Sequence, residues 1–101
     1  MVETLDAQLS GLIGEAGDVG IADGSEYARD GRLFAVRPES NVVELRLGSE
    51  IADAARRTPD TSASSRGDDW ITFSPKQWDE HAADRLAAWF RVAWRLADRG
   101  R

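Results

Sequence analysis

Apolar residues recur at helical spacing near the start of the chain. Over residues 3–16, five apolar side chains fall on one stripe of a helix: Leu5, Leu9, Leu12, Ile13 and Ala16. We therefore expect a helix there that packs as a layer over a sheet, and Gly17 is a natural place for it to end. Residues 18–24 are too rich in glycine to predict an element, and their pattern indicates a flexible connection.

Strand-like patterns follow in the middle of the chain. Residues 25–29 and 32–37 are the first two predicted strands, joined by Asp30-Gly31, a dipeptide that favours a type I′ hairpin turn. A second turn is expected at residues 38–41, with Pro38 at its first central position. Residues 42–47 give the clearest strand signal, because apolar and charged side chains alternate there with a period of two.

A short helix, a loop and an aromatic strand are predicted next. Ser49 is a good N-cap for a helix that ends before Thr58-Pro59, since proline disfavours a helical predecessor. Residues 58–69 have almost no apolar side chains to anchor them, so we expect a loop that is the most mobile internal segment. Trp70-Ile71-Thr72-Phe73 has the aromatic and β-branched composition of a strand.

The chain closes with a long amphipathic helix. Ser74, Pro75 and Gln77 form a start signal, because a serine cap, a first-turn proline and a glutamine reinforce one another. Its apolar face comprises Trp78, Ala82, Leu86, Trp89, Phe90, Ala93, Leu96 and Ala97. Together the elements predict an α+β fold, in which a small antiparallel sheet is flanked by an N-terminal helix, a short middle helix and a long C-terminal helix.

Length and composition bound this picture. A chain of 101 residues, 42% hydrophobic and 31% charged, suits a single globular domain over residues 1–101. The absence of cysteine excludes disulfides, and the acidic N-terminus has no signal-peptide pattern, so a cytoplasmic location is expected. Among the 13 basic residues only Lys76 is a lysine, a bias that indicates a GC-rich, bacterial genome rather than a function.

No catalytic or metal-binding pattern stands out. His81 is the one histidine, and neither Asp79 nor Asp84 stands four residues from it, so no acid on its helix would orient it as a hydrolytic triad requires. One histidine and no cysteine leave no transition-metal ligand set, and the aspartates of the 58–69 loop lack the spacing of a calcium loop. We therefore expect no cofactor, and a non-enzymatic protein is favoured.

Four tryptophans lie in the last 32 residues, which is the most unusual feature of the chain. Core packing is their ordinary role, but Trp94 falls at the edge of the apolar face, where an exposed tryptophan is typical of interfaces and ligand pockets. Arg91, Arg95 and Arg99 form a basic stripe, with Arg85 beside it, that suits either solvent or an acidic partner. The candidate partner or ligand contacts are Trp94, Arg91, Arg95, Trp70 and Arg66.

Three segments have the form of the packing motifs of a known family: Asp30-Gly31-Arg32-Leu33-Phe34-Ala35, Val43-Glu44-Leu45-Arg46-Leu47 and Asp69-Trp70-Ile71-Thr72-Phe73. With the closing helix, they make the chain similar to the MmcQ/YjbR-like small α+β proteins over roughly residues 25–97. The resemblance implies an antiparallel sheet flanked by helices and a role in DNA binding through wing-like hairpins. The DNA contacts in that case are Arg32, Arg37, Arg46 and Arg66.

The functional expectation is a non-enzymatic binding or interaction domain, monomeric or weakly dimeric, for an unknown protein or small ligand. DNA binding of the MmcQ/YjbR-like kind is one alternative. The net charge of −5 disfavours it, because nucleic-acid binders usually show a basic footprint. A small-ligand or enzymatic cleft between the sheet and the last helix is the other alternative, suggested by the tryptophans and the polar loop.

Overall fold

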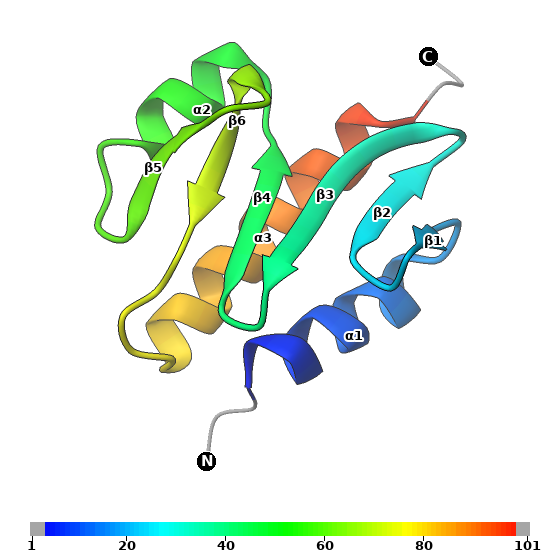
Figure 1. The fold of residues 1–101 in the computed structure, drawn as a ribbon, viewed down its shortest axis with the longest axis horizontal. Coiled ribbons are helices and arrows are strands. Elements are labelled where there is room, and N and C mark those ends of the chain that lie inside the picture. Colours follow the sequence, from blue (N-terminus) through cyan, green and yellow to red (C-terminus); the bar gives the residue numbers. More distant parts are fainter. Residues whose placement is uncertain (1–3, 99–101) are drawn as a thin grey trace.

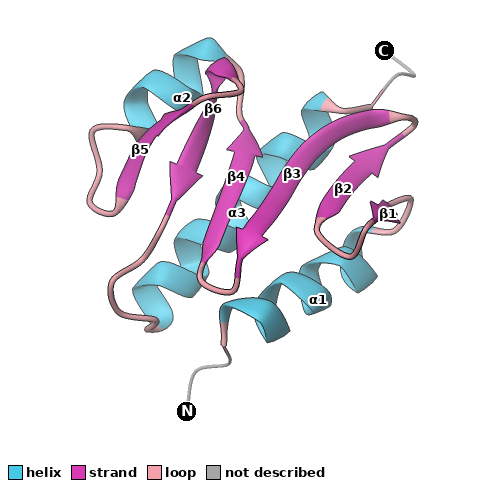
Figure 2. Ribbon diagram, viewed as in Figure 1, coloured by secondary structure: helices cyan, strands magenta, loops and turns pink. Residues whose placement is uncertain are grey.

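The computed structural model describes residues 4–98, which form an α+β fold (Figures 1 and 2). Its elements, in chain order, are α1 (Leu5–Ala16), β1 (Gly20–Ala22), β2 (Glu26–Arg29), β3 (Arg32–Glu39), β4 (Val42–Arg46), α2 (Ser49–Ala55), β5 (Thr61–Ser64), β6 (Gly67–Phe73) and α3 (Glu80–Leu96). The strands make one antiparallel sheet in the order β1-β2-β3-β4-β6-β5. The fold class predicted from the sequence is thereby confirmed.

The first helix forms where its apolar stripe predicts it. The Thr4 hydroxyl caps α1 by accepting a hydrogen bond from the backbone N–H of Ala7 at 3.2 Å. Leu5, Leu9 and Leu12 are buried in the core, and α1 packs against α3. The helix ends at Gly17, whose φ of +72° is strained for any residue with a side chain.

The first hairpins are partly as expected. Asp30 and Gly31 have φ values of +53° and +79°, which is the geometry of the predicted type I′ turn between β2 and β3. The glycine-rich segment before β2 differs from the prediction, because Gly20–Ala22 pairs with β2 as the edge strand β1. This strand is defined by its backbone pairing with β2, so no side-chain pattern predicted it.

The predicted turn at residues 38–41 is wrong in its position. β3 continues to Glu39, and the turn lies at residues 40–41. Pro38 sits inside the strand, at an irregularity in the pairing with β4 between Val36 and Glu39. A proline is tolerated there because an interrupted ladder does not need its missing N–H.

The predicted loop over residues 58–69 is also wrong. Most of it is the β5–β6 hairpin at the other edge of the sheet. Hydroxyl groups anchor its start in place of apolar side chains, since Thr58 and Thr61 both donate to the carbonyl oxygen of Ala55, at 2.7 and 2.6 Å. Polar anchoring of this kind cannot be recognised from hydrophobic periodicity.

Both later helices begin at different caps from those predicted. Gly48, and not Ser49, is the N-cap of α2. α3 begins at Glu80, capped by the Asp79 carboxylate, which accepts from the N–H of Ala82 at 2.9 Å. The predicted start at Ser74 is wrong because its backbone N–H donates to Asp60 at 2.8 Å, so residues 74–79 cross from the sheet to the helix layer.

The core lies between the sheet and the helices, and α3 runs behind β3 and β4 in Figure 1. Two edge-to-face aromatic pairs join the layers, Phe34 with Phe90 at 5.4 Å and Phe73 with Trp89 at 5.2 Å between ring centres. Leu96, predicted on the apolar face of the last helix, is instead 47% exposed. It lies in the final turn of α3 and lines a hollow together with Gly48 and Ile51, beside the start of α2.

Candidate binding site

A hollow between α1 and α3 contains three of the predicted contact residues. Arg91, Trp94 and Arg95 line it from α3, and Leu12, Glu15 and Ala16 line it from α1. Its volume is about 230 Å³. Two segments about 80 positions apart in the sequence thus build one site, with an apolar floor and a basic rim.

Trp94 is a fixed wall of this hollow. Its indole N–H donates to the carbonyl oxygen of Gly17 at 3.1 Å, which ties α3 to the end of α1. The guanidinium of Arg29 lies over the ring, 3.5 Å from its centre, and donates to the Trp94 carbonyl oxygen at 3.1 Å. Trp94 is therefore partly buried, and one ring face is occupied within the protein itself.

The arginines of the predicted stripe differ in their exposure and in their partners. Arg91 pairs with Glu15 at 3.2 Å, with both side chains at least half exposed. Arg95 is exposed and makes no ion pair among residues 4–98. Arg85 does not join the stripe, because it bonds the carbonyl oxygen of Pro59 at 2.7 Å and lies over the Phe73 ring. Arg99 lies outside the described residues.

Trp70 and Arg66 lie elsewhere, on the sheet face opposite the core. The pairing of Glu44 with Thr72, next to the buried pair of Leu45 and Ile71, defines this outer face. Trp70 is only 7% exposed there, and the Arg66 guanidinium lies 5.5 Å from its ring centre. The predicted contact residues therefore belong to two surfaces.

Arg66 is held on the outer face by a buried acid. Its Nε donates to a Glu44 carboxylate oxygen at 2.9 Å, and the Ser64 hydroxyl donates to the other oxygen at 3.0 Å. The Glu44 side chain is 11% exposed and the Arg66 side chain 35%, so the carboxylate is largely shielded from water and the guanidinium only partly. These contacts hold the β5–β6 hairpin against β4.

The four arginines predicted to contact DNA are not gathered on one surface. Arg37 forms an ion pair with Asp6 of α1 at 3.2 Å, on the helix side of the sheet. Arg46 and Arg66 lie on the outer face, and Arg32 is exposed at the β2–β3 turn. Three of the four cations are already paired with carboxylates of the chain.

The carboxylate of Asp69 shows the electrostatic effect of one such pair. A hydrogen bond from the Arg46 guanidinium, 2.8 Å long, lowers the pKa of Asp69 below its ordinary value. The bond stabilises the charged form more than partial burial opposes it. Arg46 is therefore engaged in a local contact of the sheet.

The remaining chemistry is sparse in the part of the chain that the structure describes. His81 is exposed on α3, and residues 4–98 contain no group of three or more side chains placed to hold a metal ion. Leu86, Phe34 and Phe90 fill the space between the sheet and α3, where the cleft alternative places a ligand. A hollow of about 400 Å³ lies instead beside Trp78, Pro75 and Asn41, at the opposite end of α1 from Trp94.

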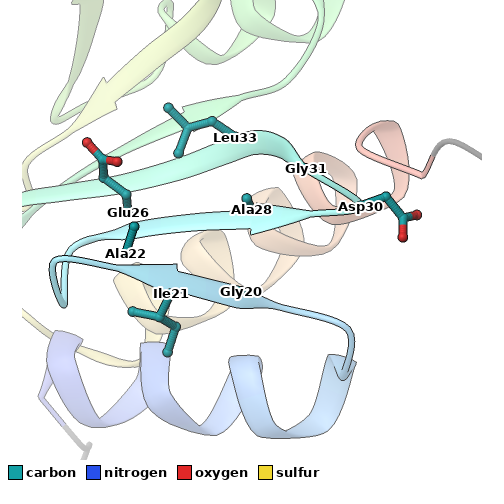
Figure 3. Close-up of a pocket in the computed structure, with 8 residues that line it drawn as sticks. All are labelled: Gly20, Ile21, Ala22, Glu26, Ala28, Asp30, Gly31 and Leu33. Atoms are coloured by element: carbon teal, nitrogen blue, oxygen red, sulfur yellow. The ribbon is translucent and has the colours of Figure 1, made fainter.

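Another hollow, of about 470 Å³, lies beside β1 and was not predicted (Figure 3). The hollow exists because adjacent positions of β1 and β2 have either no side chain, at Gly20, or only a methyl group, at Ala22 and Ala28. The sequence signal for it was the glycine- and alanine-rich composition of residues 18–24, which indicated only a flexible connection.

The comparisons with known proteins leave the family open. Neither the protein-family profiles, nor the curated proteins, nor the solved structures with which the chain was compared give a match. None of the helices over residues 4–98 has the length and apolar character needed to cross a membrane.

Proposed function

We propose that this protein is a non-enzymatic binding domain, whose hollow between α1 and α3 holds an apolar side chain and a neighbouring carboxylate of a partner protein. The observation that carries the proposal is the position of Arg95. Its guanidinium is exposed and without an ion pair among residues 4–98, at the rim of an apolar hollow walled by Trp94.

The chemistry of the hollow suits such a ligand. Leu12 and Ala16 form an apolar floor on which one side chain is removed from water. Arg95 offers the planar fork of donors that matches a carboxylate. Arg91 can join it, because its exposed pair with Glu15 is of the weak kind that a competing carboxylate replaces.

The size of the hollow favours a segment of a protein over a free small molecule. Its volume of about 230 Å³ is below the usual range of small-molecule sites, which begins at roughly 300 Å³. A second hollow of about 210 Å³ continues it along α1, past Gly11 and Gln8, and shares Leu12, Glu15 and Arg91. A chain that runs along α1 can therefore place consecutive side chains in both.

The titratable groups at the site support a binding role. They are Glu15, Arg91 and Arg95, and a guanidinium stays protonated at all physiological pH values. Two arginines can bind an anion but do not exchange protons with a substrate as general acid–base chemistry requires, and the one carboxylate of the site, Glu15, is paired with Arg91. The site is thus equipped for recognition.

The proposal is tested by selecting displayed peptides on the protein and measuring the affinity of the selected peptides for two charge-reversal variants. Arg95→Glu removes the proposed contact, and Lys76→Glu makes the same charge change at an exposed residue far from the hollow. We expect peptides that combine a carboxylate with an apolar side chain, and a loss of at least tenfold in affinity only for Arg95→Glu. Equal losses in both variants, or selected peptides insensitive to Arg95, would contradict the proposal.

DNA binding, which the MmcQ/YjbR-like resemblance implies, is the alternative. In its favour, Arg46 and Arg66 lie on the same outer face of the sheet. A backbone-amide NMR titration with a short random duplex at low salt separates the two. Shifts around Arg32, Arg46 and Arg66 that vanish with added salt would favour DNA, because each neutralised phosphate releases counterions.

A further inference from the structure

The strand β1 is an unprotected edge of the sheet. It pairs only with β2, and all three of its residues are exposed, Ile21 to 56%. Successive residues of an antiparallel strand direct their N–H and C=O groups to opposite sides, so part of the β1 backbone faces away from the sheet. Natural edges are often blocked by lysine or proline, and Gly20–Ala22 contains neither.

The hollow beside β1 provides a place for side chains of an added strand. Gly20 pairs with Ala28, and Ala28 pairs with Leu33, so the three residues share one face of the sheet. In Figure 3, Leu33 rises from β3 on the far side of the hollow, behind the nearly bare strands β1 and β2. Because Gly20 and Ala22 place so little over β1, a side chain from outside can cross it.

The charges around this edge are acidic. Asp18 and Asp23 stand at its two ends, both exposed, and Glu26 lines the hollow opposite Ala22. None of these three carboxylates has an ion-pair partner among residues 4–98. Arg29, the nearest arginine on β2, is directed to Trp94 and leaves their charge unbalanced.

We infer that β1 binds an extended basic segment of another protein, which adds to the sheet as a further strand. Side chains at alternate positions of that segment face the hollow, an apolar one over Ala28 and Leu33 and a lysine or arginine toward Glu26. Glu26 belongs to the second strand from the added one, at two strand spacings or roughly 10 Å, which a long basic side chain and the glutamate span together. The same acids repel the β1 edge of a second copy of this chain.

The test uses two synthetic peptides with backbone-amide NMR and amide exchange on the full chain. The first is acetyl-Thr-Val-Thr-Lys-Thr-Val-Thr-Lys, whose valines and lysines share one face when extended, and the second has glutamate for lysine. We expect the lysine peptide to shift the amides of Gly20, Ile21 and Ala22 and to slow their exchange, because new backbone hydrogen bonds protect them. The glutamate peptide should leave these amides unchanged.

Two double variants distinguish the acidic side chains beside β1 from the overall negative charge of the chain. Asp23→Asn with Glu26→Gln removes two rim charges, and Glu39→Gln with Asp84→Asn removes two exposed, unpaired charges elsewhere. The first should weaken binding of the lysine peptide by roughly three- to tenfold, as expected for two exposed charge contacts, and the second should not change it.

Four results would overturn the inference. They are no shift with the lysine peptide at about 1 mM, equal binding of the glutamate peptide, equal losses in the two double variants, and β1 amides that shift with protein concentration alone. The last would show that a second copy occupies the edge. None of these measurements involves Arg95 or the α1–α3 hollow, so their outcome is independent of the function proposed above.

Discussion

The guanidinium of Arg29 stacks on the ring of Trp94, 3.5 Å from its centre, and bonds the carbonyl oxygen of the same residue. With the bond from Trp94 to Gly17, this contact joins β2, α3 and the end of α1. The Arg29 side chain is 13% exposed, so the interaction is largely shielded from water. It fixes the wall of the proposed binding hollow.

Replacing Arg29 should therefore destabilise the fold. We expect Arg29→Ala to lower the free energy of unfolding by about 3 kcal/mol, the sum of about 2 kcal/mol for one desolvated cation–π contact and about 1 kcal/mol for one hydrogen bond. Urea unfolding followed by circular dichroism measures it. Arg32→Ala, an exposed arginine three residues away on the same hairpin, is the control and should stay within about 0.5 kcal/mol of the native protein. Similar losses for both would show that the stacking does not contribute.

The ion pair between the buried Glu44 and the partly exposed Arg66 gives a second prediction. Arg66→Met leaves the Glu44 carboxylate largely buried without its cation, and should cost about 2 kcal/mol, below the 3–5 kcal/mol range for fully buried pairs because the Arg66 side chain is 35% exposed. Adding Glu44→Gln should recover part of this loss, since the unpaired charge is then removed. A double variant whose loss equals the sum of the two single losses would contradict the coupling.

Two glycines should respond in opposite directions to alanine. Gly67 has φ +145°, and a Cβ there would lie 3.0 Å from an Asp69 carboxylate oxygen, so Gly67→Ala should cost about 2 kcal/mol. Gly11 is an exposed position inside α1 with open space around a Cβ, so Gly11→Ala should stabilise by about 0.5–1 kcal/mol. Thermal unfolding of both variants checks the signs. A stabilised Gly67→Ala would refute the strain at this turn.

The lowered pKa of Asp69 predicts part of the acid sensitivity. The Asp69 carboxylate binds a proton less readily in the folded protein than in the unfolded chain, because Arg46 donates a hydrogen bond to it. The resulting stabilisation is present above the ordinary value near 4 and is lost as the pH falls through the lowered pKa. This stabilisation should be below about 1 kcal/mol, because the side chains of Arg46 and Asp69 are both more than a third exposed.

Unfolding measured between pH 5 and pH 2 tests this assignment. Asp69→Asn should lose less stability over this range than the native protein, because the titrating group is gone. Asp68→Asn is the matched control, because Asp68 is the neighbouring acid, its side chain is exposed and its carboxylate makes no ion pair among residues 4–98. If the two variants have the same pH profile, the Arg46 bond is not the cause.

The elements that were predicted correctly depend on neighbouring residues. The stripe of α1, the Asp30-Gly31 turn and the alternation of β4 are each decided by local periodicity or by two backbone angles. The same holds for the burial of the apolar face of α3 over most of its length. The fold class follows from these elements, because their apolar faces must cover one another.

The elements that were missed depend on distant contacts. β1 and β5 exist because β2 and β6 offer a ladder to pair with, and the start of α3 is displaced because Ser74 bonds Asp60. The candidate site shows the same division. Sequence spacing brings Arg91, Trp94 and Arg95 to one helix, but Gly17 and Arg29 decide how much of Trp94 is available.

The sequence by itself therefore determined where the three helices and the inner strands of the sheet lie, apart from some of their ends, and the acidic balance of the chain. Only the tertiary structure decided which arginines are neutralised within the chain, which edge of the sheet is open and where the hollows lie. The physical reason is that ion pairs, sheet ladders and cavities join residues far apart in the chain, and their free energy depends on a geometry that local patterns do not contain.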